Sequence, residues 1–302
     1  MIKTRRQFLR IFAIIIIWSG LLAFVELVWR FGVLKEGFFP SQVSVIVGQK
    51  NHFAAFMTMV APLSFIYSLM MPRLSKKIFF LLAALVISIS VFLSSSDAGI
   101  GGLVFSLIIM SFFLLKNKLI KISRWGIAGI ILFIVAVLLF LVFDGYPLHL
   151  YKQLGSRLKP AKDSLQIIKD FPLFGVGGGN FRYIFSLYRS FQAPFYNYLH
   201  NEFLQLIIEK GIVGSIFYFL FFIFLFKEII IKINKRKDRL VKCLSIGILS
   251  GLFGVLGHSF FEFNFHIPAI EIKFWILLAL VYKYLNTYFY KARKENEKIS
   301  SN

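Results

Sequence analysis

The chain has 302 residues, of which 58% are hydrophobic and 38 are phenylalanine. A soluble globular domain is about 45–50% apolar, so this composition excludes a soluble protein and predicts one integral membrane domain over residues 1–302. The formal net charge of +21 would suggest nucleic-acid binding in a soluble protein. In a membrane protein, Lys and Arg instead accumulate in cytoplasmic loops, and no nucleic-acid partner is expected.

Eight apolar segments reach the length of about 18 residues at which a bilayer-spanning helix is expected. In chain order they cover residues 8–31, 53–71, 78–95, 98–115, 125–143, 203–226, 243–261 and 268–287. These runs are continuous, whereas the strands of a membrane barrel alternate in hydrophobicity. The predicted fold class is therefore an all-α polytopic membrane protein. The first run is too long for a signal peptide and lacks a small-residue cleavage site, so we expect it to remain as a span.

The positions of the basic residues predict which loops lie on which side of the membrane. Lys and Arg gather before the first span and after the second, fourth, sixth and eighth, while the loop at 94–98 has neither. Because basic loops stay inside, we expect a multi-pass plasma-membrane protein with both termini in the cytoplasm. The long segment 144–202 and the turn at 258–268 then lie outside.

The outer segment 144–202 also contains a predicted surface helix. Pro160 is suited to the first position of a helix, so we expect the helix to begin there. Ala161, Leu165 and Ile168 form one apolar stripe, which would be the buried face of an amphipathic helix.

A glycine-rich stretch, GVGGGN, covers residues 175–180. Asn180 stands where the dinucleotide fingerprint needs its third glycine, and the Walker A ending is missing, so nucleotide binding is not expected. One interpretation is an anion site, because exposed N–H groups bind anions and arginine suits phosphate oxygens. Arg157, Arg182 and Arg189 flank the stretch. The alternative is that the glycines only fold a tight turn.

Charged residues inside the spans are the next signal, because charges at membrane depth are unfavourable. Glu26 and Arg30 are four residues apart, which predicts an ion pair on one helix face. Glu271 and Lys273 lie near the start of the last span, and we expect their side chains to reach the membrane surface.

Other polar residues mark the outer end of the sixth span and its surroundings. Asn201 is a suitable cap for that span, and Gly211 suggests a helix break beside Glu209. One interpretation is that His52, beside Asn51, and His266, near Glu262, line one outer vestibule; the alternative, more usual for either histidine alone, is a place at the membrane interface. The single cysteine, Cys243, lies in an apolar run, which excludes a disulfide framework and a thiolate metal site.

The glycine stretch belongs to a longer pattern. KDFPLFGVGGGNF, followed by HNEFLQLIIEKGIVGSIFYFL, resembles the signature of the O-antigen ligase and polymerase superfamily. The matching residues are Pro172, Leu173, Gly175, Gly177, Phe181, His200, Asn201, Leu204, Gln205, Glu209, Gly211 and Gly214. Two flanking stretches, GQKNHFAAFMTMVAPL at 48–63 and HSFFEFNFHIPA at 258–269, are similar to family segments more weakly, with Glu262 at the acid position of the second.

The resemblance implies a bacterial membrane glycosyltransferase that uses a lipid carrier. Its donor would be a glycan linked to undecaprenyl diphosphate on the outer leaflet, in contact with membrane lipids. Its acceptor would be the hydroxyl of another glycan, a lipid or a protein, and other polysaccharide-assembly proteins would be partners. Polymerase and ligase both remain open. The resemblance implies no metal and no cofactor, because the donor bond stores the energy.

The resemblance also implies roles for particular residues. Arg157 would hold the diphosphate. His200 would accept the proton of the acceptor hydroxyl, or hold the phosphates as an imidazolium. The further candidates share a predicted contact with donor or glycan, and they are Gly177, Asn201, Arg182, Arg189 and Asp97.

Two features depart from the family pattern. Ser96-Asp97-Ala98 stands where the family usually carries Ser-Arg-Gly, and Asp97 could instead bind a divalent cation or pair with Arg157. The eight predicted spans are fewer than family members commonly have. Two other functions therefore stay open, namely a member without catalysis that acts as an assembly subunit, and a transporter or flippase.

Overall fold

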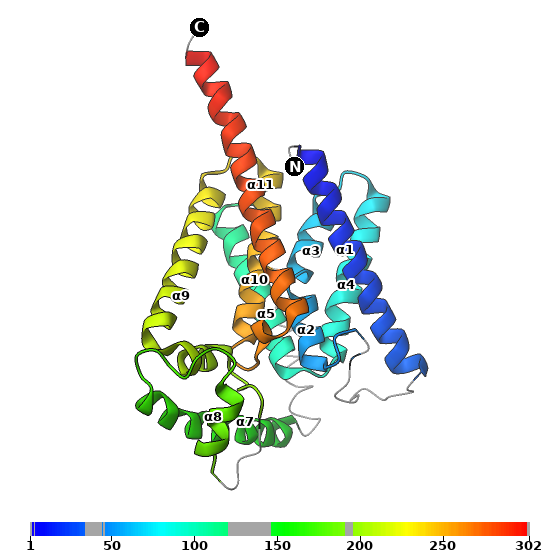
Figure 1. Cartoon of the computed structure of the whole chain (residues 1–302). Helices are drawn as coiled ribbons and strands as arrows, with labels where there is room; N and C mark the ends of the chain where they lie inside the picture. The colour runs from blue at the N-terminus through cyan, green and yellow to red at the C-terminus, as the bar shows by residue number, and fades with distance from the viewer. Residues whose placement is uncertain are drawn as a thin grey trace. The chain divides into compact units, whose positions relative to one another are not determined.

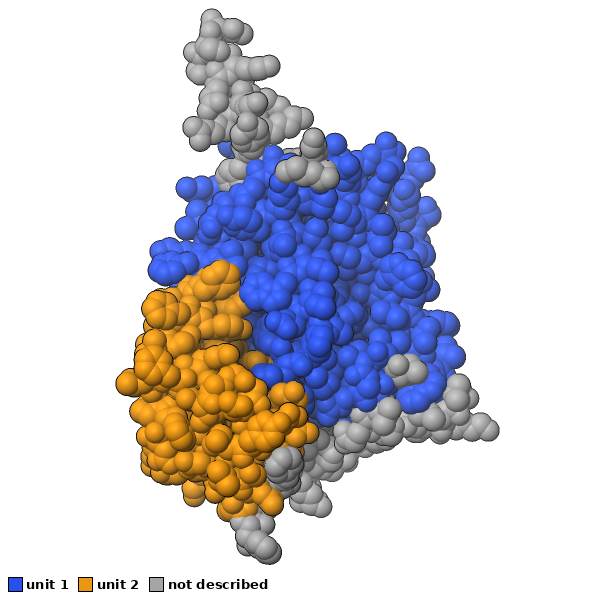
Figure 2. Space-filling model, viewed as in Figure 1, with its two compact units in different colours: residues 1–119, 223–302 blue, residues 120–222 orange. Residues whose placement is uncertain are grey.

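The computed structural model describes residues 4–33, 46–119, 146–190 and 196–300, together with the single residues 2 and 44. Within these residues every regular element is helical, and none is a strand. The chain forms two compact units, shown in Figure 2. Unit 1 consists of residues 1–119 and 223–302, and unit 2 consists of residues 120–222. The all-helical prediction is confirmed for the described residues.

Unit 1 is a bundle of long helices (Figure 1). Its elements are α1 (Arg5–Val28), the π-helix η1 (Trp29–Val33), α2 (Lys50–Thr58), α3 (Ala61–Leu69), α4 (Leu74–Leu93), α5 (Asp97–Lys116), α10 (Arg239–His258), the 3₁₀ turn η2 (Asn264–His266) and α11 (Pro268–Ser300). Unit 2 contains α7 (Tyr146–Asp170) and α8 (Phe181–Tyr188). The long helix α9 (Glu202–Lys235) begins in unit 2 and ends in unit 1.

Five helical stretches among the described residues are long and apolar enough to cross a membrane. They are Arg5–Phe31, Lys50–Leu69, Leu74–Leu93, Asp97–Lys116 and Arg239–His258, and they confirm a membrane protein. The predicted spans 203–226 and 268–287 lie in α9 and α11, which are not among these five. The predicted span 125–143 lies outside the described residues. The count of eight spans and the single integral membrane domain therefore stay predictions.

Polar side chains fix where several helices begin. Thr4 and Gln7 form a capping box before α1, in which the Thr4 Oγ1 accepts from the Gln7 N–H at 3.2 Å and Gln7 Oε1 accepts from the Thr4 N–H at 2.9 Å. Ser96 Oγ accepts from the Gly99 N–H at 3.1 Å at the start of α5. Such caps satisfy N–H groups that the first helical turn leaves without partners.

One end of unit 1 gathers basic residues from distant parts of the chain. Arg5 NH1, at the start of α1, is 3.7 Å from Asp238 Oδ2, just before α10. Lys242 Nζ, in the first turn of α10, donates to Asn117 Oδ1 at 3.0 Å, just after α5. The predicted topology requires these three loops to share one side, and the structure brings them together.

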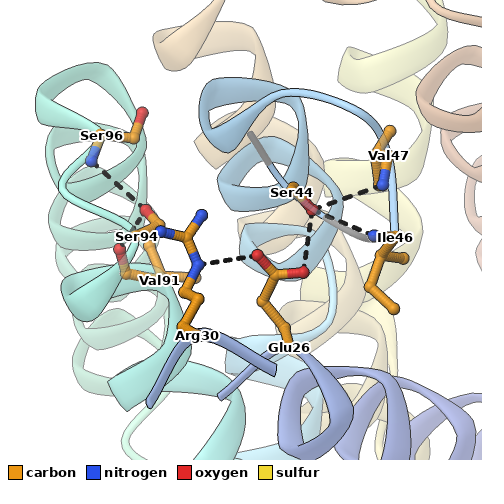
Figure 3. Close-up of polar contacts among 8 residues, drawn as sticks. All are labelled: Glu26, Arg30, Ser44, Ile46, Val47, Val91, Ser94 and Ser96. Atoms are coloured by element: carbon orange, nitrogen blue, oxygen red, sulfur yellow. Dashed lines mark hydrogen bonds and ion pairs between the residues drawn. The ribbon is translucent and has the colours of Figure 1, made fainter. Parts of the chain in front are cut away.

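A buried ion pair lies near the end of α1. Arg30 Nε donates to Glu26 Oε1 at 2.7 Å, and both side chains are only 1% exposed. Ser44 Oγ donates to the other carboxylate oxygen at 3.0 Å (Figure 3). The predicted pairing of Glu26 with Arg30 is confirmed. Pairing and hydrogen bonding make burial of the two charges tolerable.

Lys273 turns into unit 1, so the prediction that it reaches the membrane surface is wrong. Its Nζ donates to the Phe56 carbonyl oxygen at 2.8 Å and lies 3.3 Å from the centroid of the Phe56 ring. The chain breaks between α2 and α3, and there the Val60 N–H donates to the Met57 carbonyl oxygen instead of to Phe56 four residues back. The break thus frees a part-buried acceptor, which Lys273 satisfies.

The surface helix predicted in unit 2 is longer than expected and uses another face. Pro160 lies inside α7, so the predicted start there is wrong. Among the side chains of α7 that the structure describes, the buried ones are Pro160, Ser164 and Ile167, whereas Leu165 is 49% exposed. The stripe of Ala161, Leu165 and Ile168 has the same spacing but is displaced by one residue, or about 100° around the helix.

The face of α7 that is buried is selected by the aromatic residues of unit 2 itself. Ile167 belongs to a core with Phe181 and Phe185 of α8, together with Leu199 and Ile208. The Phe181 and Phe185 rings stack at 5.0 Å between centroids. Since those partners come from later in the sequence, the α7 pattern alone does not identify the buried face.

We predict that Lys273→Met lowers the melting temperature of the detergent-purified protein by several degrees. The substitution leaves the part-buried Phe56 carbonyl without its partner, and an unsatisfied acceptor costs up to about 1–3 kcal/mol when it is shielded from water. Lys283→Met, on the same helix, is the charge-matched control and should change the melting temperature little. Equal melting temperatures for the two variants would contradict this account.

Candidate functional site

The helix α9 breaks at Gly211, as the sequence predicted. Gly211 has φ 66° and ψ −176°, far from helical values. In a regular helix each N–H donates to the carbonyl four residues earlier. The break therefore removes two helical bonds, from Ile212 to Ile208 and from Val213 to Glu209.

The loss of these two bonds leaves two N–H groups and two carbonyls without helical partners. The glycine loop (residues 171–180) supplies replacement partners for all four. The N–H groups of Ile212 and Val213 donate to the carbonyls of Pro172 and Leu173 at 2.9 and 3.2 Å. In return, the carbonyls of Ile208 and Glu209 accept from the N–H groups of Val176 and Gly177, both at 2.9 Å. The two segments are therefore joined by their backbones alone.

Only glycine allows the backbones to approach so closely. A Cβ added to Gly175 would lie 2.4 Å from the Ile208 carbonyl oxygen, and one added to Gly211 would lie 2.2 Å from the Leu173 carbonyl oxygen. Both residues also have positive φ. For this part of the loop the tight-turn interpretation holds, because the Val176 and Gly177 N–H groups already donate within the protein. Gly177 as a substrate contact stays a prediction.

The segment that carries His200 is held by the first turns of α9. Asn201 Oδ1 accepts from the Leu204 N–H at 2.9 Å, so the predicted cap is confirmed. Gln205 is fully buried. Its Oε1 accepts from the Leu199 N–H at 2.7 Å and its Nε2 donates to Glu209 Oε1 at 3.1 Å. The residues on both sides of His200 are thereby fixed.

His200 itself is half-buried, and its ring lies edge-on to Tyr196 at 5.2 Å between centroids. A half-buried imidazole can be reached by a substrate. Gln205 was part of the sequence motif but had no predicted role. Its position four residues before Glu209, on one helix face, was the sequence feature that could have predicted their hydrogen bond.

The predicted arginines lie on the two helices that form the rest of unit 2. Arg157 is half-buried on α7, while Arg182 and Arg189 are exposed at the two ends of α8. Arg182 stacks over the Tyr183 ring at 4.6 Å. A further cation is Lys210, whose Nζ would be 2.5 Å from a Cβ built on Gly178. Unit 2 thus presents several cations on α7, at the ends of α8 and in the first part of α9.

Carboxylates of α7 hold the end of α8. Asp163 Oδ2 accepts from the Ser190 N–H at 2.8 Å and from its hydroxyl at 3.0 Å. Asp170 Oδ2 accepts from the Tyr188 hydroxyl at 2.8 Å. This hydrogen bond, with a smaller contribution from burial, raises the pKa of Tyr188 above its ordinary value. These contacts place Arg189, between Tyr188 and Ser190, close to α7.

Asp97 lies in unit 1, in the first turn of α5. Its Oδ2 atom is buried and has no hydrogen-bond partner among the described residues. A carboxylate near a helix N-terminus is favoured by the helix dipole. Among those same residues, no group of three His, Cys, Asp or Glu side chains could hold a metal ion. The contact of Asp97 with substrate stays a prediction.

A second polar cluster in unit 1 joins the two weaker flanking motifs. Asn51 Nδ2, in the first turn of α2, donates to Glu262 Oε2 at 2.5 Å, and Glu262 is fully buried. The His52 ring lies edge-on to Phe263 at 5.1 Å. The stretches 48–63 and 258–269 are therefore neighbours in space, as a shared vestibule requires.

Comparison with known families matches residues 81–219 to the O-antigen ligase family. This part of the chain is an O-antigen ligase family domain. The domain includes the part of α4 from residue 81, all of α5, the glycine loop, His200 and the break at Gly211. No curated protein matches the chain. With its candidate spans, the chain is a membrane protein that carries an O-antigen ligase domain.

We predict that Gly211→Ala and Gly175→Ala each disrupt the junction between the glycine loop and α9. An added methyl group would overlap backbone atoms at 2.2–2.4 Å, and positive φ adds strain for any L-residue. We expect strongly reduced yield of folded protein or a melting temperature lower by many degrees. Gly155→Ala is the control, because a Cβ there meets nothing within 4 Å, and wild-type behaviour of all three variants would contradict the close approach.

A second prediction concerns Gln205. Gln205→Leu should leave the fold intact but free the Leu199 N–H, so the amide of Leu199 should exchange with solvent about tenfold faster or more, since losing a buried bond costs about 1–3 kcal/mol. Hydrogen exchange read by mass spectrometry over residues 196–201 measures this. Gln166→Leu, which removes an exposed bond to Asp170, is the matched control and should leave that exchange unchanged.

Proposed function

We propose that this protein is a glycosyltransferase that moves a glycan from undecaprenyl diphosphate to an acceptor hydroxyl in the assembly of a surface polysaccharide. The observation that carries the proposal is the O-antigen ligase match over residues 81–219. Within it, His200 is held on both sides, by the Asn201 cap and by the bond of Gln205 to Leu199.

The proposed reaction breaks the bond between the sugar anomeric carbon and the diphosphate oxygen, and it forms a bond from that carbon to the acceptor oxygen. His200, as a neutral imidazole, accepts the acceptor proton. The bonding electrons leave with the diphosphate, whose developing charge Arg157 stabilises. In the other assignment of roles, His200 as an imidazolium shares the phosphates with Arg157. Both assignments place the reaction at the outer leaflet, where the donor bond supplies the free energy.

The remaining predicted contacts fit the donor side of this reaction. Arg182 and Arg189 lie at the ends of α8 and are exposed, so they are proposed to contact the diphosphate or the glycan. Asn201 uses its side-chain oxygen as a cap, which leaves its amide nitrogen as the group for a substrate. Gly177 is proposed as a loop contact on the same side.

The proposed setting is the bacterial plasma membrane with both termini in the cytoplasm. The basic end of unit 1, where Arg5 lies near Asp238 and Lys242 bonds Asn117, supports this orientation through the positive-inside rule. The predicted outer segment 144–202 would then lie on the side where lipid-linked glycans are found. Glycan, lipid and protein acceptors remain open.

A second function, a non-catalytic assembly subunit, is favoured by Asp97. It places a carboxylate where the family usually has an arginine, which exchanges a positive charge for a negative one near the expected diphosphate. The intact His200 and Arg157 favour the enzyme.

The test is a profile of lipid-linked glycans and surface polysaccharide in the native host. We expect that a deletion strain is not rescued by His200→Ala or Arg157→Ala, because the variants lose the proton acceptor or the charge that stabilises the leaving group, by about 10² or more in rate. Single repeat units stranded on the carrier would identify a polymerase, and long polymer stranded there would identify a ligase. Arg73→Ala, at the start of α4, is the matched control and should rescue.

Two outcomes would overturn the proposal. Full rescue by both variants, at equal protein levels, would exclude catalysis at this site and favour the assembly subunit. An unchanged glycan profile in the deletion strain would remove the protein from polysaccharide assembly altogether.

A further inference from the structure

A cavity of ≈ 760 Å³ lies at the basic end of unit 1. Its lining comes from the ends of three helices and the turn before α10, and consists of Arg5, Leu69, Met70, Lys237, Asp238, Arg239 and Leu240. Small-molecule sites typically measure about 300–1,000 Å³, so the cavity has room for a ligand. None of its residues belongs to the site proposed for glycan transfer.

The charge of the lining favours an anion. Three cationic side chains face one carboxylate, that of Asp238. This carboxylate is already engaged, since its Oδ1 accepts from the N–H groups of Leu240 and Val241 at 2.9 and 3.1 Å and its Oδ2 lies 3.7 Å from Arg5 NH1. One N–H of Arg239 donates to the Leu119 carbonyl oxygen at 3.2 Å, and a guanidinium has five such donors.

The position of the cavity shows which kind of anion can reach it. The candidate span Arg5–Phe31 begins at the cavity, Lys50–Leu69 ends there and Arg239–His258 begins there. The ends of spanning helices lie at the level of the lipid headgroups. The cavity also has an apolar part, formed by Leu69, Met70 and Leu240, which a small hydrated anion would not use.

We propose that this cavity binds the headgroup of an anionic phospholipid. Arg5, Lys237 and Arg239 hold the phosphate, and the apolar residues contact the glycerol and the first methylene groups. Basic pockets between spanning helices are suited to such headgroups. A zwitterionic lipid fits less well, because its own ammonium group opposes the three cations. The proposal is independent of the one for glycan transfer.

The chain offers two single substitutions with opposite expected effects. Lys237→Gln removes one cation from the rim and should weaken binding about fivefold, the effect of one basic residue near a charged membrane surface. Asp238→Asn removes the opposing charge but keeps the helix cap, because Asn caps as well as Asp, so it should strengthen binding by a similar factor. Lys77→Gln, near the start of α4 and outside the lining, is the control.

The measurement is native mass spectrometry of the full chain in detergent micelles titrated with dioleoyl phosphatidylglycerol. Dioleoyl phosphatidylcholine and inorganic phosphate are run in parallel. We expect preferential retention of phosphatidylglycerol, weakened by Lys237→Gln, strengthened by Asp238→Asn and unaltered by Lys77→Gln. Equal retention of phosphatidylcholine would overturn the proposal. So would displacement of the lipid by inorganic phosphate at millimolar concentration, or identical binding by all three variants.

Discussion

An apolar helix that breaks must find new partners for the backbone groups that the break exposes, because buried groups without partners are strongly unfavourable. In α9 the break at Gly211 exposes two carbonyls and two N–H groups, and the glycine loop satisfies all four. Glu209 is held twice, since its carbonyl accepts from Gly177 and its carboxylate accepts from Gln205. Gln205 in turn holds Leu199, next to His200. The glycine motif and the histidine motif are therefore one connected structure.

The same constraint explains why Lys273 turns into unit 1, although the sequence predicted that it reaches the membrane surface. In unit 1 the chain breaks between α2 and α3, and the freed carbonyl of Phe56 is satisfied by Lys273 from α11. Here the Lys273 side chain provides the missing hydrogen-bond partner, whereas in unit 2 the backbone of the glycine loop provides it. Both solutions join a broken helix to a distant segment, so both breaks also fix tertiary structure.

Features that depend on residues close together in sequence were predicted correctly, whereas features that depend on distant residues were not. The pair of Glu26 and Arg30, the Asn201 cap and the Gly211 break each depend on residues within one helical turn, which the sequence shows directly. The buried face of α7 depends on Phe181 and Phe185, and two stripes of equal spacing could not be separated without them. Pro160 can start a helix, but it can also lie inside one when neighbouring contacts compensate. The partner of the glycine loop, more than thirty residues away, had no signal beyond the glycines.

The family match from 81 to 219 does not coincide with either compact unit. It covers unit 2 up to residue 219, but from unit 1 it takes only α5 and the part of α4 from residue 81, and it leaves out α10. Yet α5 packs closely on α10, and a Cβ on Gly102 would lie 2.8 Å from the Gly254 carbonyl oxygen. The helix that carries Asp97 is thus supported from outside the matched region, by the same α10 that leads to Glu262. A Cβ on Gly99, two residues after Asp97, would lie 2.3 Å from the Ala54 Cβ, so the stretch 48–63 also packs on this helix from outside the matched region.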